Sequence, residues 1–159
     1  MTRFLKNLIR VLPIFLLLLT GCSTDETDED EVALSNDLVL GASAKDYLSD
    51  ERFTALEIEI VYVNGYEPTP DALSNLKIFL NKYINKPDGI IIKTRAVASP
   101  NLGTYSLEEI ISQEKINRTS FSREKTLSTY IFFADDKSVD SKEDKKIIGK
   151  AYRNTSMII

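Results

Sequence analysis

Apolar and polar positions alternate where the folded part of the chain begins. Leucine, isoleucine or tyrosine stands at every second position from Leu56 to Tyr62. The positions between them are first glutamate, Glu57 and Glu59, and then valine. A period of two is typical of a β-strand, and the change to valine predicts burial on both faces toward its end. We expect Glu57 and Glu59 on the solvent face near a sheet edge, rather than as a carboxylate pair for acid–base chemistry.

A helical pattern follows this strand. Leucines recur at intervals of three and four residues between Leu73 and Leu80, which places them on one face of a helix. Thr69 is a typical N-cap residue, and Pro70 suits the first helical position because it needs no hydrogen bond from its nitrogen. The pattern therefore predicts an amphipathic helix over residues 70–85, ended by a Lys-Pro-Asp-Gly sequence.

The next run, 90–97, opens with three isoleucines and predicts a second strand covered on both faces. Strand, helix and strand form a β-α-β unit, in which the strands are parallel and the crossover is right-handed. Further along, Ser106 and Glu109 form a capping box that predicts the start of a short helix. A third strand is predicted at 128–134 and a fourth at 151–159.

Together these elements predict an α/β fold. The sheet is expected to be mixed and four-stranded, in the order β-α-β-α-β-β, with one long crossover helix and one short helix. Two helices cover only part of such a sheet, and the chain finishes on Met-Ile-Ile within a predicted strand, where domains usually end in polar residues. We therefore expect a domain at 45–159 that is incomplete at its C-terminal end.

A short apolar run of about nine residues, 11–19, lies near the start of the chain. It is too short to span a bilayer, which takes roughly 20 residues. Three basic residues precede the run: Arg3, Lys6 and Arg10. Its end resembles the cleavage motif of bacterial lipoprotein signal peptides, formed here by Leu19, Thr20, Gly21 and Cys22. The prediction is a signal peptide at 1–21 and a lipidated, palmitate-carrying Cys22, the only cysteine, as a membrane anchor.

Charge is distributed unevenly behind this motif. Seven acidic residues and no basic residue lie between Cys22 and Leu38, whereas the two charge types are equal in number from Leu38 onward. A neutral domain gives no indication of nucleic-acid binding. The segment 22–44 is expected to be a flexible tether, because its acidic run repels itself and buries little. The acidic residues are Asp25, Glu26, Asp28, Glu29, Asp30, Glu31 and Asp37.

Two explanations of the acidic run remain open. One is a solvated spacer. The other is a sorting signal, since acidic residues just behind a lipidated cysteine resemble the signals that export Bacteroidetes lipoproteins to the outer face of the outer membrane. Ser23, rather than aspartate, directly after Cys22 also fits outer-membrane sorting. The expected location is the bacterial outer membrane, with the domain on its periplasmic or its cell-surface side.

Few residues suggest catalysis. The chain has no histidine, which excludes a Ser-His-Asp triad and an H-E-x-x-H zinc motif in these 159 residues. Oxygen ligands for calcium could come from Asp135, Asp136 and Asp140, which follow the third predicted strand. Lysines are interleaved with these acids and the spacing matches no EF-hand, so a solvated loop is the favoured interpretation.

The succession of elements from Leu56 to Ile159 resembles the N-terminal half of zinc-dependent metallopeptidases, above all the membrane-anchored, metzincin-like proteins of Bacteroidetes. The resemblance implies a zincin-like half-domain in which the last, edge strand runs along the substrate cleft. It also implies that an H-E-x-x-H helix would follow, so zinc is expected only in a full-length relative, and this chain as written would be a catalytically inactive, truncated copy. The implied substrate-edge residues are Tyr152, Arg153, Asn154, Thr155 and Ser156.

Two other hypotheses compete with this one. In the first, the chain is a complete, non-enzymatic lipoprotein whose small α/β domain binds a peptide, a protein or another surface ligand. In the second, it is a calcium-stabilised, adhesin-like module that uses the Asp135–Asp144 loop. For residues 152–156, the interpretation as an ordinary core strand also stays open.

Overall fold

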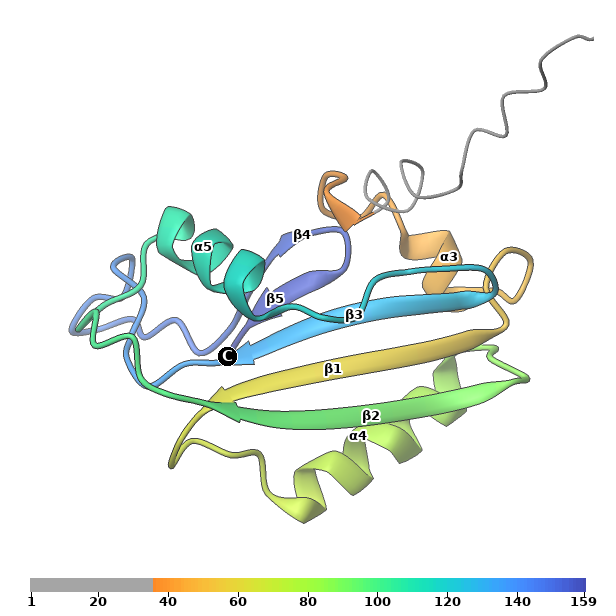
Figure 1. Cartoon of the computed structure of the whole chain (residues 1–159), viewed down its shortest axis with the longest axis horizontal. Helices are drawn as coiled ribbons and strands as arrows, with labels where there is room; N and C mark the ends of the chain where they lie inside the picture. Colours follow the sequence, from red (N-terminus) through yellow and green to blue (C-terminus); the bar gives the residue numbers. More distant parts are fainter. Residues whose placement is uncertain (1–35) are drawn as a thin grey trace, which may run out of the picture.

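The computed structural model describes residues 36–159, which form an α/β fold around one five-stranded mixed sheet (Figure 1). The predicted fold class is therefore confirmed. The strands lie in the spatial order β2-β1-β3-β5-β4. Four of them are parallel, and β4 runs antiparallel to its neighbour β5. The strands are β1 (Ala55–Val63), β2 (Gly89–Val97), β3 (Thr126–Phe133), β4 (Lys150–Arg153) and β5 (Ser156–Ile158).

The sheet has one strand more than predicted, because the expected fourth strand is a hairpin. The chain turns at Asn154 and Thr155, and β4 then pairs with β5 across an irregularity between Ala151 and Arg153. Asparagine and threonine favour turns because their side chains bond to nearby polar groups. The prediction of one continuous strand over 151–159 is therefore wrong.

Strand β1 lies at the centre of the sheet and pairs along most of its length with β2 on one side and β3 on the other. This position explains its apolar residues on both faces. It also overturns the expectation for its glutamates, since Glu59 is buried and Glu57 is largely covered. Both point from a central strand into the layer between the sheet and the segment 118–123 that follows α5.

Three helices cover the two faces of the sheet. Helix α4 (Pro70–Tyr83) connects β1 to β2 as predicted, and the Thr69 hydroxyl accepts a hydrogen bond from the amide of Ala72 at 3.2 Å. Helix α5 (Leu107–Asn117) connects β2 to β3 and begins with the expected capping box of Ser106 and Glu109. Helix α3 (Ala44–Leu48) was not predicted and begins at the last residue of the segment expected to be tether.

Two apolar clusters form the core, one on each face of the sheet. The cluster on the α4 face includes Leu56, Ile58 and Ile60 of β1 together with the leucines of α4 and Tyr47 of α3. The cluster on the α5 face includes Val61, Tyr130 and residues from α5 and β5. A polar layer replaces this second cluster toward the N-terminal ends of the strands.

Residues ahead of the predicted domain boundary also pack onto the fold. Asn36 and Ser43 are buried, and Asn36 hydrogen-bonds to side chains of the α5 face. Contacts with the folded domain thus begin at Asn36, nine residues before the predicted start of the domain at position 45. Within residues 36–159, no helix combines the length and the apolar character needed to cross a membrane.

Candidate peptide-binding edge at strand β4

Strand β4 forms one edge of the sheet. Among residues 36–159 it pairs with β5 alone, so the backbone groups along its other side have no strand partner. Such an edge offers a row of N–H and C=O groups to an extended peptide. The edge is short, from Lys150 to Arg153, and the second edge of the sheet is the longer strand β2.

The structure divides the predicted substrate-edge residues among three positions. Tyr152 and Arg153 lie on β4 at the sheet edge, as the resemblance implied. Asn154 and Thr155 form the turn, and Ser156 begins β5, where it is 1% exposed between β3 and β4. Only the first two of the five can therefore face a peptide at the β4 edge.

Arg153 holds one end of the β4 edge in place. Its Nη1 atom contacts Asp37 Oδ1 at 2.6 Å and Glu114 Oε2 at 3.3 Å. The backbone amide of Asn154 donates to the carbonyl oxygen of Leu38 at 3.1 Å. These contacts join the edge strand to helix α5 and to the first described residues of the chain.

Beneath this edge lies a buried ion pair that sequence reasoning missed. Arg118 Nη1 donates to Glu114 Oε1 at 2.7 Å and to Ser156 Oγ at 3.0 Å. The same guanidinium donates through Nη2 to Asn36 Oδ1 at 2.9 Å and to Thr155 Oγ1 at 3.3 Å. Glu114 lies in the last turns of α5 and Arg118 is its C-cap residue, beyond the short helix that the capping box predicted; their i,i+4 spacing was the available signal.

Tyrosine hydroxyls near the edge stay protonated. Burial raises the pKa of Tyr152, and the carboxylate of Glu114 raises it further. Burial likewise raises the pKa of Tyr130, with the charge of Glu59 adding to the effect. Neither side chain can act as a base near neutral pH, so the edge offers backbone hydrogen bonds rather than acid–base chemistry.

Glu59 is also unavailable for catalysis. Its carboxylate accepts hydrogen bonds from Thr119 Oγ1 at 2.7 Å and from the backbone amides of Thr119 and Ser120, each at 2.9 Å. Glu57 accepts from the hydroxyl of Ser120 and pairs with Lys93 at 3.0 Å. Burial raises the pKa of Glu57, but these two partners outweigh it and lower the pKa overall. Both glutamates therefore stabilise the segment after α5.

A shallow hollow lies beside the start of β4. It is bounded by α5, by the last residues of the chain and by the segment that enters β4. Its lining is largely apolar and could receive one side chain of a peptide that pairs with β4. The lining residues include Ile110, Ile147, Ile148, Lys150 and Ile158.

The calcium candidates do not form a common site in the part of the chain that the structure describes. Asp135 accepts hydrogen bonds from Ser99 and from Tyr105 Oη, the latter at 2.8 Å, and these bonds outweigh burial and lower its pKa. Asp140 pairs with Lys150 at 3.2 Å, and Asp136 lies in the lining of the hollow. No group of three or more histidine, cysteine or carboxylate ligands occurs within residues 36–159.

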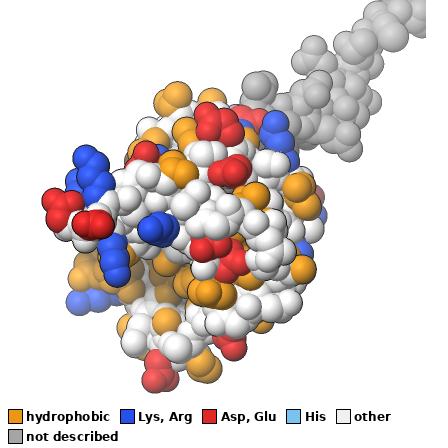
Figure 2. All heavy atoms as spheres, turned by 90° about the vertical axis from the view of Figure 1, so that its left-hand side faces the viewer, with side chains coloured by type: hydrophobic (Ala, Val, Ile, Leu, Met, Phe, Trp, Pro, Cys, Tyr) orange, Lys and Arg blue, Asp and Glu red, His pale blue; other side chains and the backbone are white. Residues whose placement is uncertain are grey.

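Figure 2 shows the end of the molecule at which β1, β2 and β3 finish, and basic, acidic and hydrophobic side chains are mixed over this surface. The predicted lipidation site Cys22 and the motif residues Leu19, Thr20 and Gly21 lie outside the described residues. Comparison with known proteins gave no match: no family model, no curated protein and no solved structure matches the chain.

Proposed function

We propose that this protein is a lipid-anchored protein of the bacterial outer membrane, attached through Cys22. Its domain corresponds to the N-terminal part of a metzincin-like zinc metallopeptidase, and the open edge of β4 binds the backbone of an extended peptide. The observation that carries the proposal is the antiparallel edge strand Lys150–Arg153, which follows a parallel sheet with a long crossover helix and lies beside an apolar hollow.

Coverage of the sheet also supports the proposal. No residue of α4 is fully buried, although Leu73, Leu76 and Leu80 pack against the core. Phe133 and Met157, on the same face, are also only partly buried. The α4 face therefore keeps exposed apolar surface that a further element could cover, as expected for one half of a larger domain.

Zinc does not fit the residues described. The 159 residues contain no histidine, and residues 36–159 hold no cluster of three ligands. The chemistry of such a metal, activation of water for peptide hydrolysis, would need ligands from beyond these residues. The role proposed for this domain is therefore peptide binding without hydrolysis.

The DNA that follows the codon for Ile159 tests the relationship to metallopeptidases. Read in all frames, it is expected to encode an H-E-x-x-H motif within about forty codons, because a zinc-binding helix in that family follows the sheet. A downstream region without this motif would contradict the proposal. It would favour the second candidate, a complete binding domain. The hydrogen bonds that Arg118 makes to Glu114, Ser156 and Asn36 support that candidate, because they join distant parts of the chain into one buried network.

Peptide binding at β4 can be mapped by NMR on the chain. A soluble hexapeptide of alternating valine and serine, with blocked ends, is expected to shift the amide signals of residues 150–153, because strand addition forms hydrogen bonds to the edge backbone. The open edge of β2, Gly89–Val97, is the internal control and should not respond. Equal shifts at both edges, or none at β4, would count against the proposed site.

A further inference from the structure

Three consecutive aliphatic residues are exposed near the beginning of the described chain. The exposed fractions are 42% for Leu38, 78% for Val39 and 61% for Leu40. The chain turns directly after them, where the amide of Ala42 donates to the carbonyl of Val39 at 3.1 Å. We call residues 38–40 the apolar tip. An aliphatic run displayed on a turn indicates a surface that another apolar phase covers.

The apolar tip is held outward by contacts on both sides. Asn36 is buried and hydrogen-bonded to Arg118, and Ser43 Oγ accepts a hydrogen bond from Asn154 Nδ2 at 2.8 Å. The carbonyl of Leu38 accepts from the backbone of Asn154. The tip therefore projects from the domain at a fixed place instead of folding onto its surface.

We propose that the apolar tip inserts into the lipid surface to which the chain is anchored. The inference rests on the lipid anchor proposed above. Cys22 is fourteen residues from Asn36, and the tip begins two residues further on. A second apolar contact close to a lipid anchor adds to the membrane attachment and orients the domain on the surface.

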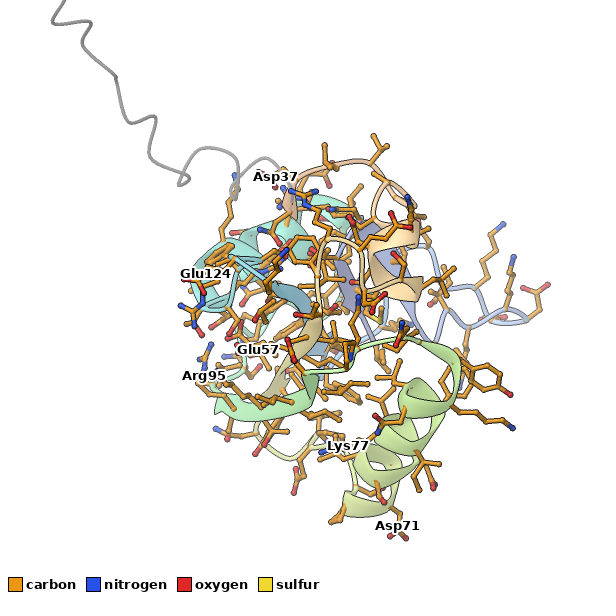
Figure 3. The ribbon with its side chains drawn as sticks, turned by 90° about the vertical axis from the view of Figure 1, so that its right-hand side faces the viewer. Asp37, Glu57, Asp71, Lys77, Arg95 and Glu124 are labelled. Carbon is orange, nitrogen blue, oxygen red and sulfur yellow. The ribbon has the colours of Figure 1, made fainter. Side chains whose placement is uncertain are left out.

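The reach of the chain favours this surface over the other exposed apolar area, on α4. Ile78, Phe79 and Tyr83 of α4 are each more than half exposed. Figures 1 and 3 place α4 at the opposite end of the domain from the first described residues, with Asp37 at one end and Asp71 and Lys77 at the other. Fourteen extended residues span at most about 50 Å. The domain is roughly 35 Å across, so turning α4 toward the membrane would take about two thirds of that length, whereas the tip needs almost none of it.

Charge around the tip is paired. Asp37 contacts Arg153 at 2.6 Å, and Lys45 contacts Glu51 at 2.6 Å. A surface whose charges are neutralised in pairs loses less solvation at a lipid interface than one with isolated charges. The described residues thus combine the exposed aliphatic side chains of the tip with two charge pairs, and six further acidic residues, within 25–31, lie ahead of the tip in the sequence.

Tryptophan fluorescence tests this inference directly, because the chain contains no tryptophan. A Val39→Trp variant places one reporter in the apolar tip, and an Ile78→Trp variant places a matched reporter on α4. Each is studied with the chain held on its own Cys22 in nanodiscs. Each is also studied as a Cys22→Ser chain whose signal peptide is replaced by a histidine tag bound to nickel-chelating lipid.

We expect the Val39→Trp emission to shift to shorter wavelength and to be roughly halved by brominated lipid, since an interfacial side chain lies about 5–10 Å into the headgroup and acyl boundary. The Ile78→Trp emission should neither shift to shorter wavelength nor be quenched by brominated lipid. A Val39→Trp reporter that is not quenched in either arrangement overturns the inference. Mass spectrometry of Cys22 separates the two proposals. An unmodified Cys22, with quenching of Val39→Trp on nickel-chelating lipid, refutes only the proposal that Cys22 is lipidated. A lipidated Cys22 without quenching refutes only the proposal that the apolar tip inserts into the membrane.

Discussion

Replacing Arg118 by methionine is expected to lower the free energy of unfolding by about 3–5 kcal/mol, because the change leaves the buried charge of Glu114 with only Arg153, at 3.3 Å, as a cationic partner. The Arg118 and Glu114 side chains are 2% and 4% exposed, so water cannot replace the lost partner. The change also removes donors to Ser156, Asn36 and the carbonyl of Ser128. Urea unfolding of the purified chain measures the loss.

Two variants control this experiment. Arg52→Met removes a half-exposed arginine that lies 3.9 Å from Asp46, and it should change stability by no more than about 1 kcal/mol. The double variant Glu114→Gln, Arg118→Met removes both charges and should recover part of the loss. If Arg118→Met costs no more than Arg52→Met, the buried pair does not stabilise the fold as the structure indicates.

Local sequence patterns were sufficient for the β1-α4-β2 unit. The alternation in β1, the leucine spacing of α4 and the isoleucine run of β2 each identified their element from a short window. The prediction that β2 is covered on both faces is wrong, because β2 is an edge strand and its Ile91 is 56% exposed. The caps at Thr69 and Ser106 were predictable for the same reason, since each bond joins residues three positions apart. The α/β class followed from the order of these elements.

The elements that were missed depend on distant contacts. Residues 36–44 look like tether and helix α3 was not predicted because the local pattern is weak there. These residues are held by partners more than 80 positions away, such as Tyr47 with Thr129 and Asn36 with Arg118. The β4–β5 hairpin was missed because both of its strands are short and no glycine or proline marks the turn. Its register is fixed by β3 and by Arg118, which no local window includes.

At the β4 edge, too, local sequence patterns predicted one part of the structure and distant contacts determined the rest. The sequence resemblance pointed to residues 152–156, and two of these residues lie on the edge strand. Whether a residue faces a partner or the core depends on the turn at Asn154 and Thr155, because the chain reverses there and Ser156 returns inside the sheet. The peptide binding proposed for this edge therefore depends on a turn whose place is set by tertiary contacts with Leu38 and Ser43.

Lys86→Met is the second change with a large expected effect, a loss of about 2–3 kcal/mol in the free energy of unfolding. Lys86 is 7% exposed, and its ammonium donates to the carbonyl oxygens of Asp46, Ser49 and Phe53 at 2.6, 2.5 and 2.7 Å. Methionine fills similar space but has no donor, so three carbonyl groups lose their partner. The exposed Lys45→Met is the matched control and should leave the free energy of unfolding almost unchanged, because water solvates both Lys45 and its partner Glu51.

Hydrogen exchange shows where the loss acts. In Lys86→Met the amides of α3, including Tyr47 and Ser49, should exchange faster than in the wild type, while the amides of β1 and β3 keep their order of protection.

Burial lowers the pKa of Lys86, partly offset by Asp46 and Asp50. The folded state therefore releases this proton before the unfolded state does, and the lysine's contribution to stability rises as the pH approaches 10.5 from below. Methionine should abolish that rise, and a variant that keeps it would show that another group titrates there.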